Sequence, residues 1–186
     1  NSYGEKFSLD LDGKRILGGA PYTAYVKIAD GCDNCCTYCA IPLIRGRFRS
    51  RKIENIVDEV RDLASCGVTE IVITAQDTTA YGIDIYGEYA LARLLRELCK
   101  IEGIHWIRTL YTYPEKITDE LLFAIRDEEK LCKYLDIPIQ HCNNKILKLM
   151  NRRGDGAFLR QLFGKLRDKM PDIVLRTSVI TGLPGE

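Results

Sequence analysis

Short apolar runs typical of buried strands alternate with amphipathic helical segments along most of this chain. Residues 70–75 (EIVITA) are rich in β-branched side chains, whereas residues 52–66 repeat apolar side chains at helical spacing. Such alternation predicts parallel strands joined by right-handed helical crossovers. The expected strands are 22–29, 70–75, 105–112, 133–140 and 173–181, and the expected helices are 52–66, 88–100, 118–130, 143–150 and 156–169.

Five strand–helix units fit either a barrel or a doubly wound sheet. The sequence has no Gly-x-Gly-x-x-Gly motif, so no sequence signal supports a dinucleotide-binding fold. In a barrel the functional loops follow the carboxyl ends of the strands. Nearly all the unusual polar, glycine and cysteine residues follow the expected strands, in segments 30–39, 75–79, 111–114, 140–141 and 182–186. We therefore expect a site at that end of a barrel.

Local signals set the limits of the first expected helix. Ser50 precedes the apolar repeat and is a plausible N-cap, and Gly67 follows it at a position that favours glycine. In the expected strand 133–140, Asp136 and Gln140 alternate with apolar residues. Both should therefore face the interior of the barrel, where a carboxylate needs a partner such as Arg176.

The composition is that of a globular domain. Hydrophobic residues make up 46% and charged residues 28% of the 186 residues, and the net charge of +1 does not indicate a nucleic-acid binder. No run of about 18 apolar residues and no leader is visible, which predicts a cytoplasmic protein without a membrane partner. Since the chain starts at Asn1, we expect a piece of a longer protein, with residues 1–20 as a linker and 21–186 as one domain.

Four of the eight cysteines crowd into residues 32–39, and the others are isolated. In a reducing compartment, clustered cysteines indicate metal or redox chemistry rather than disulfides. A structural zinc site needs four ligands, usually in two pairs, and no second pair is present. Cys32, Cys36 and Cys39 form a three-thiolate loop, which would leave one metal position open for a reactant. Zinc held with help from Cys35 is the alternative.

The spacing Cys32-x-x-x-Cys36-x-x-Cys39 on the loop after the first strand resembles the radical S-adenosylmethionine (SAM) superfamily. The resemblance implies a [4Fe-4S] cluster held by these three cysteines, with SAM bound to the open iron. It also implies reductive cleavage of SAM to methionine and a 5′-deoxyadenosyl radical. The implied fold is a partial parallel (βα) barrel of six units, of which this chain would lack the last strand.

Longer stretches narrow the resemblance to the methylthiotransferase family. Residues 28–51, 144–152 and 182–186 look like that family, and residues 75–82 (AQDTTAYG) and 134–141 (YLDIPIQH) are similar to its RimO branch. That branch methylthiolates the β-carbon of an aspartate in small-subunit ribosomal protein S-twelve. The runner-up is the MiaB branch, which modifies a tRNA adenosine.

This family resemblance also implies partners and further domains. The partners would be the ribosomal protein or the ribosome, or a tRNA for the runner-up, and a reductant such as flavodoxin or ferredoxin. Family members carry an N-terminal domain with an auxiliary [4Fe-4S] cluster and a C-terminal TRAM domain. Because this sequence contains neither, we expect it to bind the cluster and SAM without completing sulfur insertion alone.

The resemblance further implies contacts with SAM. Tyr38 would lie near the adenine, with a packing tyrosine as the alternative. Gln76 and Asp77, at the end of the second expected strand, would contact the SAM amine, with a turn cap as the alternative. Arg176 would contact SAM, with an ion pair to Asp136 as the alternative. The residues implied in SAM binding are Tyr38, Gln76, Asp77, Gln140, Arg176, Gly182 and Pro184.

Positive charge is concentrated just after the cysteine loop. Residues 45–52 contain Arg45, Arg47, Arg49, Arg51 and Lys52. Such a run is either a solvated approach to a helix or a surface that docks on RNA or the ribosome. A zinc-stabilised RNA-binding module that uses this run is thus a hypothesis of a different class.

Overall fold

The computed structural model describes residues 20–186, so almost all of the expected linker 1–20 lies outside the described residues. Its long strands are all parallel and follow one another in the order of the chain. One sheet contains β1 (Thr23–Lys27), β4 (Glu70–Thr74) and β5 (Trp106–Thr109), and a second contains β6 (Tyr134–Asp136) and β7 (Val174–Arg176).

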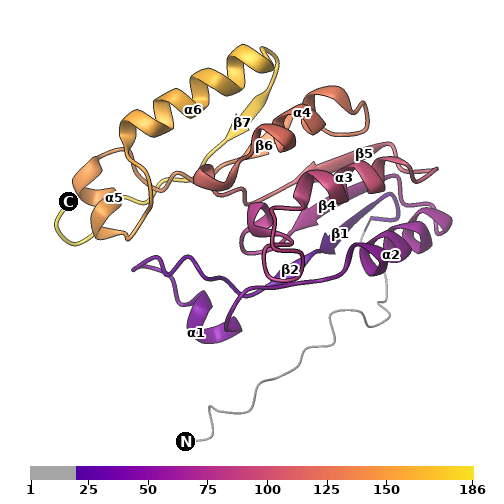
Figure 1. Ribbon diagram of the computed structural model, residues 1–186, viewed down its shortest axis with the longest axis horizontal. Helices are drawn as coiled ribbons and strands as arrows, with labels where there is room; N and C mark the ends of the chain where they lie inside the picture. The colour runs from indigo at the N-terminus through magenta and orange to yellow at the C-terminus, as the bar shows by residue number, and fades with distance from the viewer. Residues whose placement is uncertain (1–19) are drawn as a thin grey trace, which may run out of the picture.

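The two sheets form one curved row of strands (Figure 1). Ile107 of β5 forms a parallel bridge with Leu131, and its carbonyl accepts a hydrogen bond of 3.0 Å from the Cys132 N–H. Further along, the Thr112 N–H donates to the Asp136 carbonyl at 2.9 Å. These contacts place β6 next to β5, so the spatial order is β1-β4-β5-β6-β7. The predicted partial parallel barrel is therefore confirmed.

The larger helices lie along the outer side of this row (Figure 1), and successive ones contact each other. Each buries one apolar face; in α2 this face includes Ile56, Val60 and Leu63. No helix of the described part of the chain is long and apolar enough to cross a membrane. The helices are α2 (Ile53–Ser65), α3 (Leu91–Cys99), α4 (Asp119–Asp127), α6 (Gly156–Lys169) and the short α5 (Asn144–Leu149).

The first expected strand and helix differ in detail from the structure. The strand 22–29 is divided, because β2 (Ala29–Asp30) leaves β1 and pairs antiparallel with β3 (Arg49–Ser50). The prediction that Ser50 caps α2 is wrong. Its backbone belongs to β3, and its hydroxyl accepts a hydrogen bond of 3.0 Å from the Gly82 N–H. Gly67 follows α2 with φ of 90°, the left-handed conformation expected there.

Short elements that the periodicity did not predict surround the carboxyl ends of the strands. They are α1 (Ile41–Arg45) and two 3-10 turns, η1 (Thr78–Ala80) and η2 (Pro114–Lys116). Each is shorter than two helical turns, so no apolar repeat could reveal it. Two of them follow β4 and β5 directly, and they shape the mouth of the barrel.

Candidate functional site

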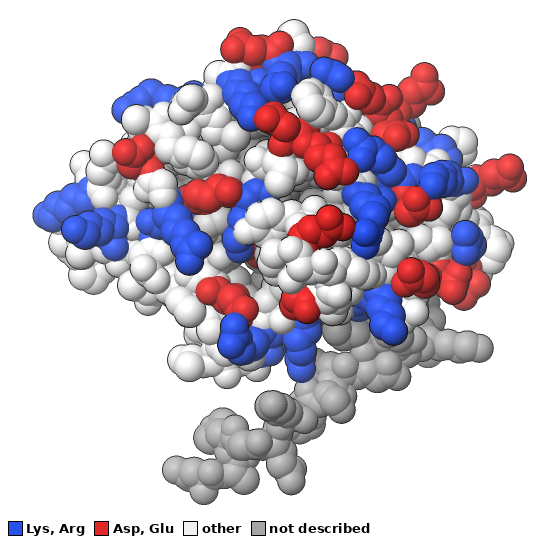
Figure 2. Space-filling view, viewed as in Figure 1, with Lys and Arg blue, Asp and Glu red and all other residues white. Residues whose placement is uncertain are grey.

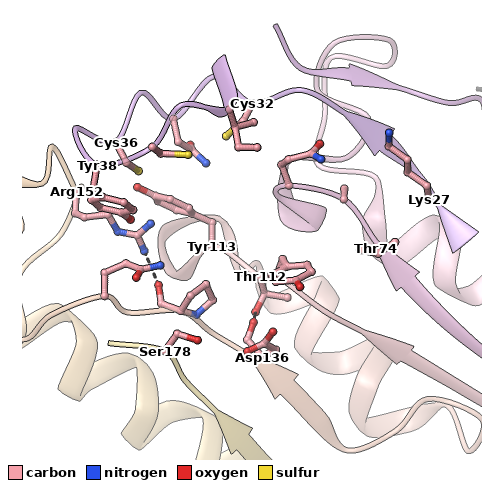
Figure 3. A pocket seen from close by; sticks show the side chains of 18 residues that line it. Lys27, Cys32, Cys36, Tyr38, Thr74, Thr112, Tyr113, Asp136, Arg152 and Ser178 are labelled. Carbon is pink, nitrogen blue, oxygen red and sulfur yellow. Dashed lines mark hydrogen bonds between the residues drawn. The ribbon is translucent and has the colours of Figure 1, made fainter. Parts of the chain in front are cut away.

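A cavity of about 610 Å³ opens at the carboxyl ends of the parallel strands. Its walls come from the segments that follow β2, β4, β5 and β6, together with Ser178 after β7 (Figure 3). Four of the five segments expected to hold the site thus meet there, and segment 182–186 does not. Of the expected site residues, the cavity is lined by Cys32, Cys36, Cys39, Tyr38, Gln76 and Gln140.

The cysteine loop begins with a glycine that no other residue could replace without strain. Gly31 has φ of 78°, and a Cβ built there would lie 2.2 Å from the Arg47 carbonyl oxygen. The next residue, Cys32, donates its N–H to the Gly46 carbonyl at 3.2 Å. The β2–β3 hairpin therefore fixes the direction in which the loop leaves the sheet.

One flank of the loop is held by buried charge. Asn34 Nδ2 donates to Asp77 Oδ2 at 2.8 Å, and Lys116 Nζ donates to the same oxygen at 2.6 Å and to Asn34 Oδ1 at 2.8 Å. The other oxygen, Asp77 Oδ1, accepts from Thr79 Oγ1 and from the Ala80 N–H. Asp77 is thus the cap of η1 and an anchor of the loop, and protein donors occupy both of its oxygens.

The other flank is held by the turn after α5. Asn151 Nδ2 donates to the Cys35 carbonyl at 2.9 Å, and the Thr37 N–H donates to the Met150 carbonyl at 3.2 Å. Cys35 and Asn151 both adopt the left-handed conformation, with φ of 51° and 54°. Cys35 is exposed and does not line the cavity, so its contribution to this contact comes from the backbone.

A group of four side chains forms one wall of the cavity (Figure 3). The Arg152 guanidinium lies 3.9 Å above the centre of the Tyr113 ring, and its Nη2 donates to the Pro138 carbonyl at 2.9 Å. Burial raises the pKa of the Tyr38 hydroxyl, and the neighbouring Cys36 thiol raises it further. Arg152 was not predicted as a site residue. It belongs to the stretch 144–152, but only the tertiary structure brings it beside Cys36.

Two polar atoms in the cavity wall lack a partner. Asp136 is almost wholly buried; its Oδ2 accepts from Arg176 Nη1 at 3.1 Å, whereas no group in residues 20–186 donates a hydrogen bond to its Oδ1. Gln76 Oε1 is likewise buried without a partner among these residues. Asp136 and Gln140 both line the cavity, as the alternation predicted. Gln76 lines it too, but the two unpartnered oxygens are themselves buried, so each side chain must turn before its free oxygen can accept a hydrogen bond from a ligand.

Three other expected contacts lie away from the cavity. Arg176 is largely exposed and acts on the site through its ion pair with Asp136. Gly182 and Pro184 are exposed and do not line the cavity. Their turn is closed by Glu186, whose Oε2 accepts from the Gly182 N–H at 2.7 Å and whose Oε1 lies 3.3 Å from His141 Nε2.

The basic run 45–52 is largely engaged within the protein. Arg51 is buried and lies 2.6 Å from Glu59 Oε2, Arg49 lies 3.6 Å from Asp30, and Arg47 lies 3.3 Å from Asp33. Figure 2 shows basic and acidic side chains interspersed over much of the visible face. These ion pairs favour a structural role for the run over an RNA-docking surface.

The donor set of the cavity fits an iron–sulfur cluster. Within residues 20–186, no three cysteine, histidine or acidic side chains are grouped closely enough to hold a single metal ion. The zinc alternative therefore finds no preformed site there. Three thiols of one loop instead line a cavity together with Gln76 and Asp136, each of which has an oxygen without a partner among these residues. This arrangement suits a larger thiolate-bound cluster next to a ligand with an amine.

Comparison with known sequences gives concordant matches. The family model described as the radical SAM superfamily matches residues 26–186. The chain is 52% identical over 183 residues to the ribosomal protein uS12 methylthiotransferase RimO of Alkaliphilus oremlandii, covering 98% of the chain and 42% of the relative. The proteins of that name from Clostridium botulinum and Acetivibrio thermocellus are each 56% identical, over 94% and 95% of the chain and 39% of each relative. The chain thus spans about two fifths of these relatives.

Solved structures show the same fold at low sequence identity. The radical S-adenosylmethionine methyltransferase TsrM from Kitasatospora setae, with tryptophan and a SAM analog bound, gives a TM-score of 0.69 at 17% identity, covering 89% of this chain and 32% of TsrM. The cobalamin-dependent S-adenosylmethionine radical enzyme OxsB gives 0.63 at 15% identity, covering 84% and 23%.

Proposed function

Because this chain belongs to the radical SAM superfamily, we propose that it is the core of a methylthiotransferase that modifies an aspartate of ribosomal protein uS12. The proposal is supported by relatives of that name that are 52–56% identical over nearly the whole chain. Since the chain spans about two fifths of those relatives, the complete reaction is proposed for the whole protein, with residues 21–186 as its radical SAM domain.

The observation that carries the proposal is that three thiols of one loop line a single cavity together with Gln76 and Asp136, each of which has an oxygen without a partner in the described part of the chain. Cys32, Cys36 and Cys39 would hold a [4Fe-4S] cluster and leave one iron without a protein ligand. When bound, the cluster supplies the electron for the reductive cleavage of SAM. The protein's part is to hold the cluster, orient SAM and limit access of water.

We assign the expected site residues direct or indirect roles toward SAM according to whether they line the cavity. Gln76 and Asp136 line the cavity, and each has one buried oxygen without a partner within residues 20–186. After a rotation of the side chain toward the cavity, these oxygens would accept hydrogen bonds from the amine of SAM. Tyr38 and Gln140 line the same cavity and would contact the rest of the molecule. Asp77 would act by anchoring the cysteine loop, and Arg176 by holding the Asp136 carboxylate.

The first experiment tests the cofactors. The chain is reconstituted anaerobically with iron and sulfide, and its reduced EPR spectrum is recorded with and without SAM. About four irons and four sulfides per chain, with a spectrum that changes on addition of SAM, is the expected result. Bound zinc in place of iron, or a spectrum indifferent to SAM, would overturn the proposal.

The second experiment tests the substrate. A full-length protein that contains this chain is incubated with SAM, a reductant such as flavodoxin or ferredoxin, and either uS12 or tRNA. Mass spectrometry of uS12 should reveal a methylthio group on an aspartate. Transfer to a tRNA adenosine instead would assign the chain to the runner-up branch.

A further inference from the structure

One cysteine of the loop differs from the others in its surroundings. Tyr38, Tyr113 and Arg152 line the cavity together with Cys36, and each of these three side chains interacts electrostatically with the Cys36 thiol. Tyr113 comes from the segment after β5 and Arg152 from the segment after α5, so two distant parts of the chain converge on this thiol. Figure 3 shows these side chains gathered on one side of the cavity.

Arg152 is the charged member of this group, and it is held rigidly. Arg152 is 9% exposed. Its guanidinium carbon lies 3.9 Å from the centre of the Tyr113 ring, and its Nη2 donates to the Pro138 carbonyl. Stacking on a ring and donation to a carbonyl at the same time require a flat group that carries several N–H donors. Arginine has that geometry and lysine does not.

Within the described part of the chain Arg152 forms no ion pair with a carboxylate, although its charge acts on the nearby, partly buried Glu115 carboxyl. At Cys32 the situation is different, because the cation of Lys116 lies 2.6 Å from the carboxylate of Asp77. The net positive charge near the three thiols therefore lies on the side of Cys36.

We propose that Arg152 is a positioning residue that orients the Cys36 thiolate and stabilises the reduced state of the cluster this site would hold. The inference rests on the proposed function. Hydrogen bonds to cluster sulfurs and nearby positive charge both favour the added electron, so they raise the reduction potential. Arg152 would thus make the cluster easier to reduce, the step on which cleavage of SAM depends.

The test compares four reconstituted proteins: wild type, R152Q, R152K and R153Q. Arg153 is the exposed neighbour of Arg152, so R153Q is a matched control for loss of charge. Iron content is measured by metal analysis. The fraction of reduced cluster at a fixed solution potential is measured by EPR-monitored redox titration. In R152Q the ratio of reduced to oxidised cluster should fall about tenfold, equivalent to about 59 mV for a one-electron couple. R152K should lie between R152Q and wild type, and R153Q should match wild type.

The outcomes separate the two proposals. If the wild type takes up no cluster, the proposed function itself fails. If the wild type loads iron and R152Q shows the same potential, only the role of Arg152 is refuted. Should R152Q unfold, as judged by circular dichroism, R152K decides the matter, because it keeps the charge but loses the flat guanidinium group. A wild-type potential in a folded R152K would then refute the role.

Discussion

Lys116 and Asp77 form an ion pair with Nζ 2.6 Å from Oδ2, and the Asp77 carboxylate is almost wholly buried. Both groups also hydrogen-bond to the Asn34 side chain. The pair therefore joins the segments after β4 and β5 to the loop that contains the three cysteines. Three strand ends that are distant in the sequence are thus locked together directly beside the cavity.

Removal of this lysine should destabilise the whole domain. In K116M the buried Asp77 carboxylate loses its cation, and breaking a buried pair in this way costs about 3 kcal/mol. Urea unfolding of the iron-free protein at neutral pH measures the loss. K165M breaks the exposed Lys165–Asp119 pair and should leave the unfolding midpoint unchanged. Equal midpoints for K116M and K165M would contradict the structural role of Lys116.

The close approach at Gly31 predicts a strong effect of a single methyl group. In G31A the new Cβ would meet the Arg47 carbonyl oxygen, so the loop must shift and should lose most of its bound iron. G87A is the control, because Gly87 also has positive φ but has open space around it. It should lose only about 1–2 kcal/mol of stability, the cost of the left-handed backbone, and leave the iron content unchanged. Iron analysis and urea unfolding test both expectations.

Cys35 separates a three-thiolate cluster from the zinc alternative. Its side chain is exposed and does not line the cavity, so C35A should bind as much iron as wild type. C36A removes a ligand from the cavity wall and should lose most of the iron. Metal analysis after anaerobic reconstitution compares the two variants. Equal losses in C35A and C36A would favour a four-cysteine zinc site.

Unpartnered acceptors of side chains that line the cavity should contribute to the affinity for SAM. D136N removes the charge of Asp136 while preserving its shape, and a hydrogen bond to a charged group contributes about 1.5–3 kcal/mol. Titration calorimetry on reconstituted protein should therefore show SAM binding at least about tenfold weaker. D172N, on an exposed turn, should bind SAM like wild type. Unchanged affinity in D136N would exclude Asp136 from the SAM site.

Glu115 should make stability depend on pH. Burial raises the pKa of its carboxyl above the ordinary value of 4.5. The folded state therefore holds the proton more tightly, so the contribution of Glu115 to stability is complete below pH 4.5 and is lost as pH rises through the folded pKa. E115Q should accordingly gain stability relative to wild type between pH 4 and pH 8. The exposed variant E102Q is the control, and a gain in E115Q that is independent of pH would contradict the assignment.

The sequence was informative wherever a period or a spacing recurs. The β-branched run of β4 and the apolar repeat of α2 located these elements within a few residues, and the alternation in 133–140 placed Asp136 and Gln140 on the cavity face. These predictions succeed because the burial of one face imposes a pattern on neighbouring residues.

What the sequence did not reveal depends on contacts between distant segments. Arg152 stacks on Tyr113, and Lys116 reaches Asn34 and Asp77, without any local pattern that marks these partners. The Ser50 hydroxyl could cap a helix, but the backbone of Ser50 is part of β3 and pairs with Ala29 of β2. The role of Asp77 was left open between a ligand contact and a turn cap, and only its four donors show that it caps η1.

The partners that hold the cysteine loop lie far along the chain. Asn34 contacts Asp77 and Lys116, 43 and 82 residues away, and the Cys35 carbonyl contacts Asn151, 116 residues away. Closing contacts of such sequence separation costs chain entropy. The loop therefore depends for its shape on the rest of the folded domain, including the turn after α5. In contrast to a zinc finger, which folds around its metal, this domain would hold the backbone of its cysteine loop by protein contacts before iron and sulfide bind.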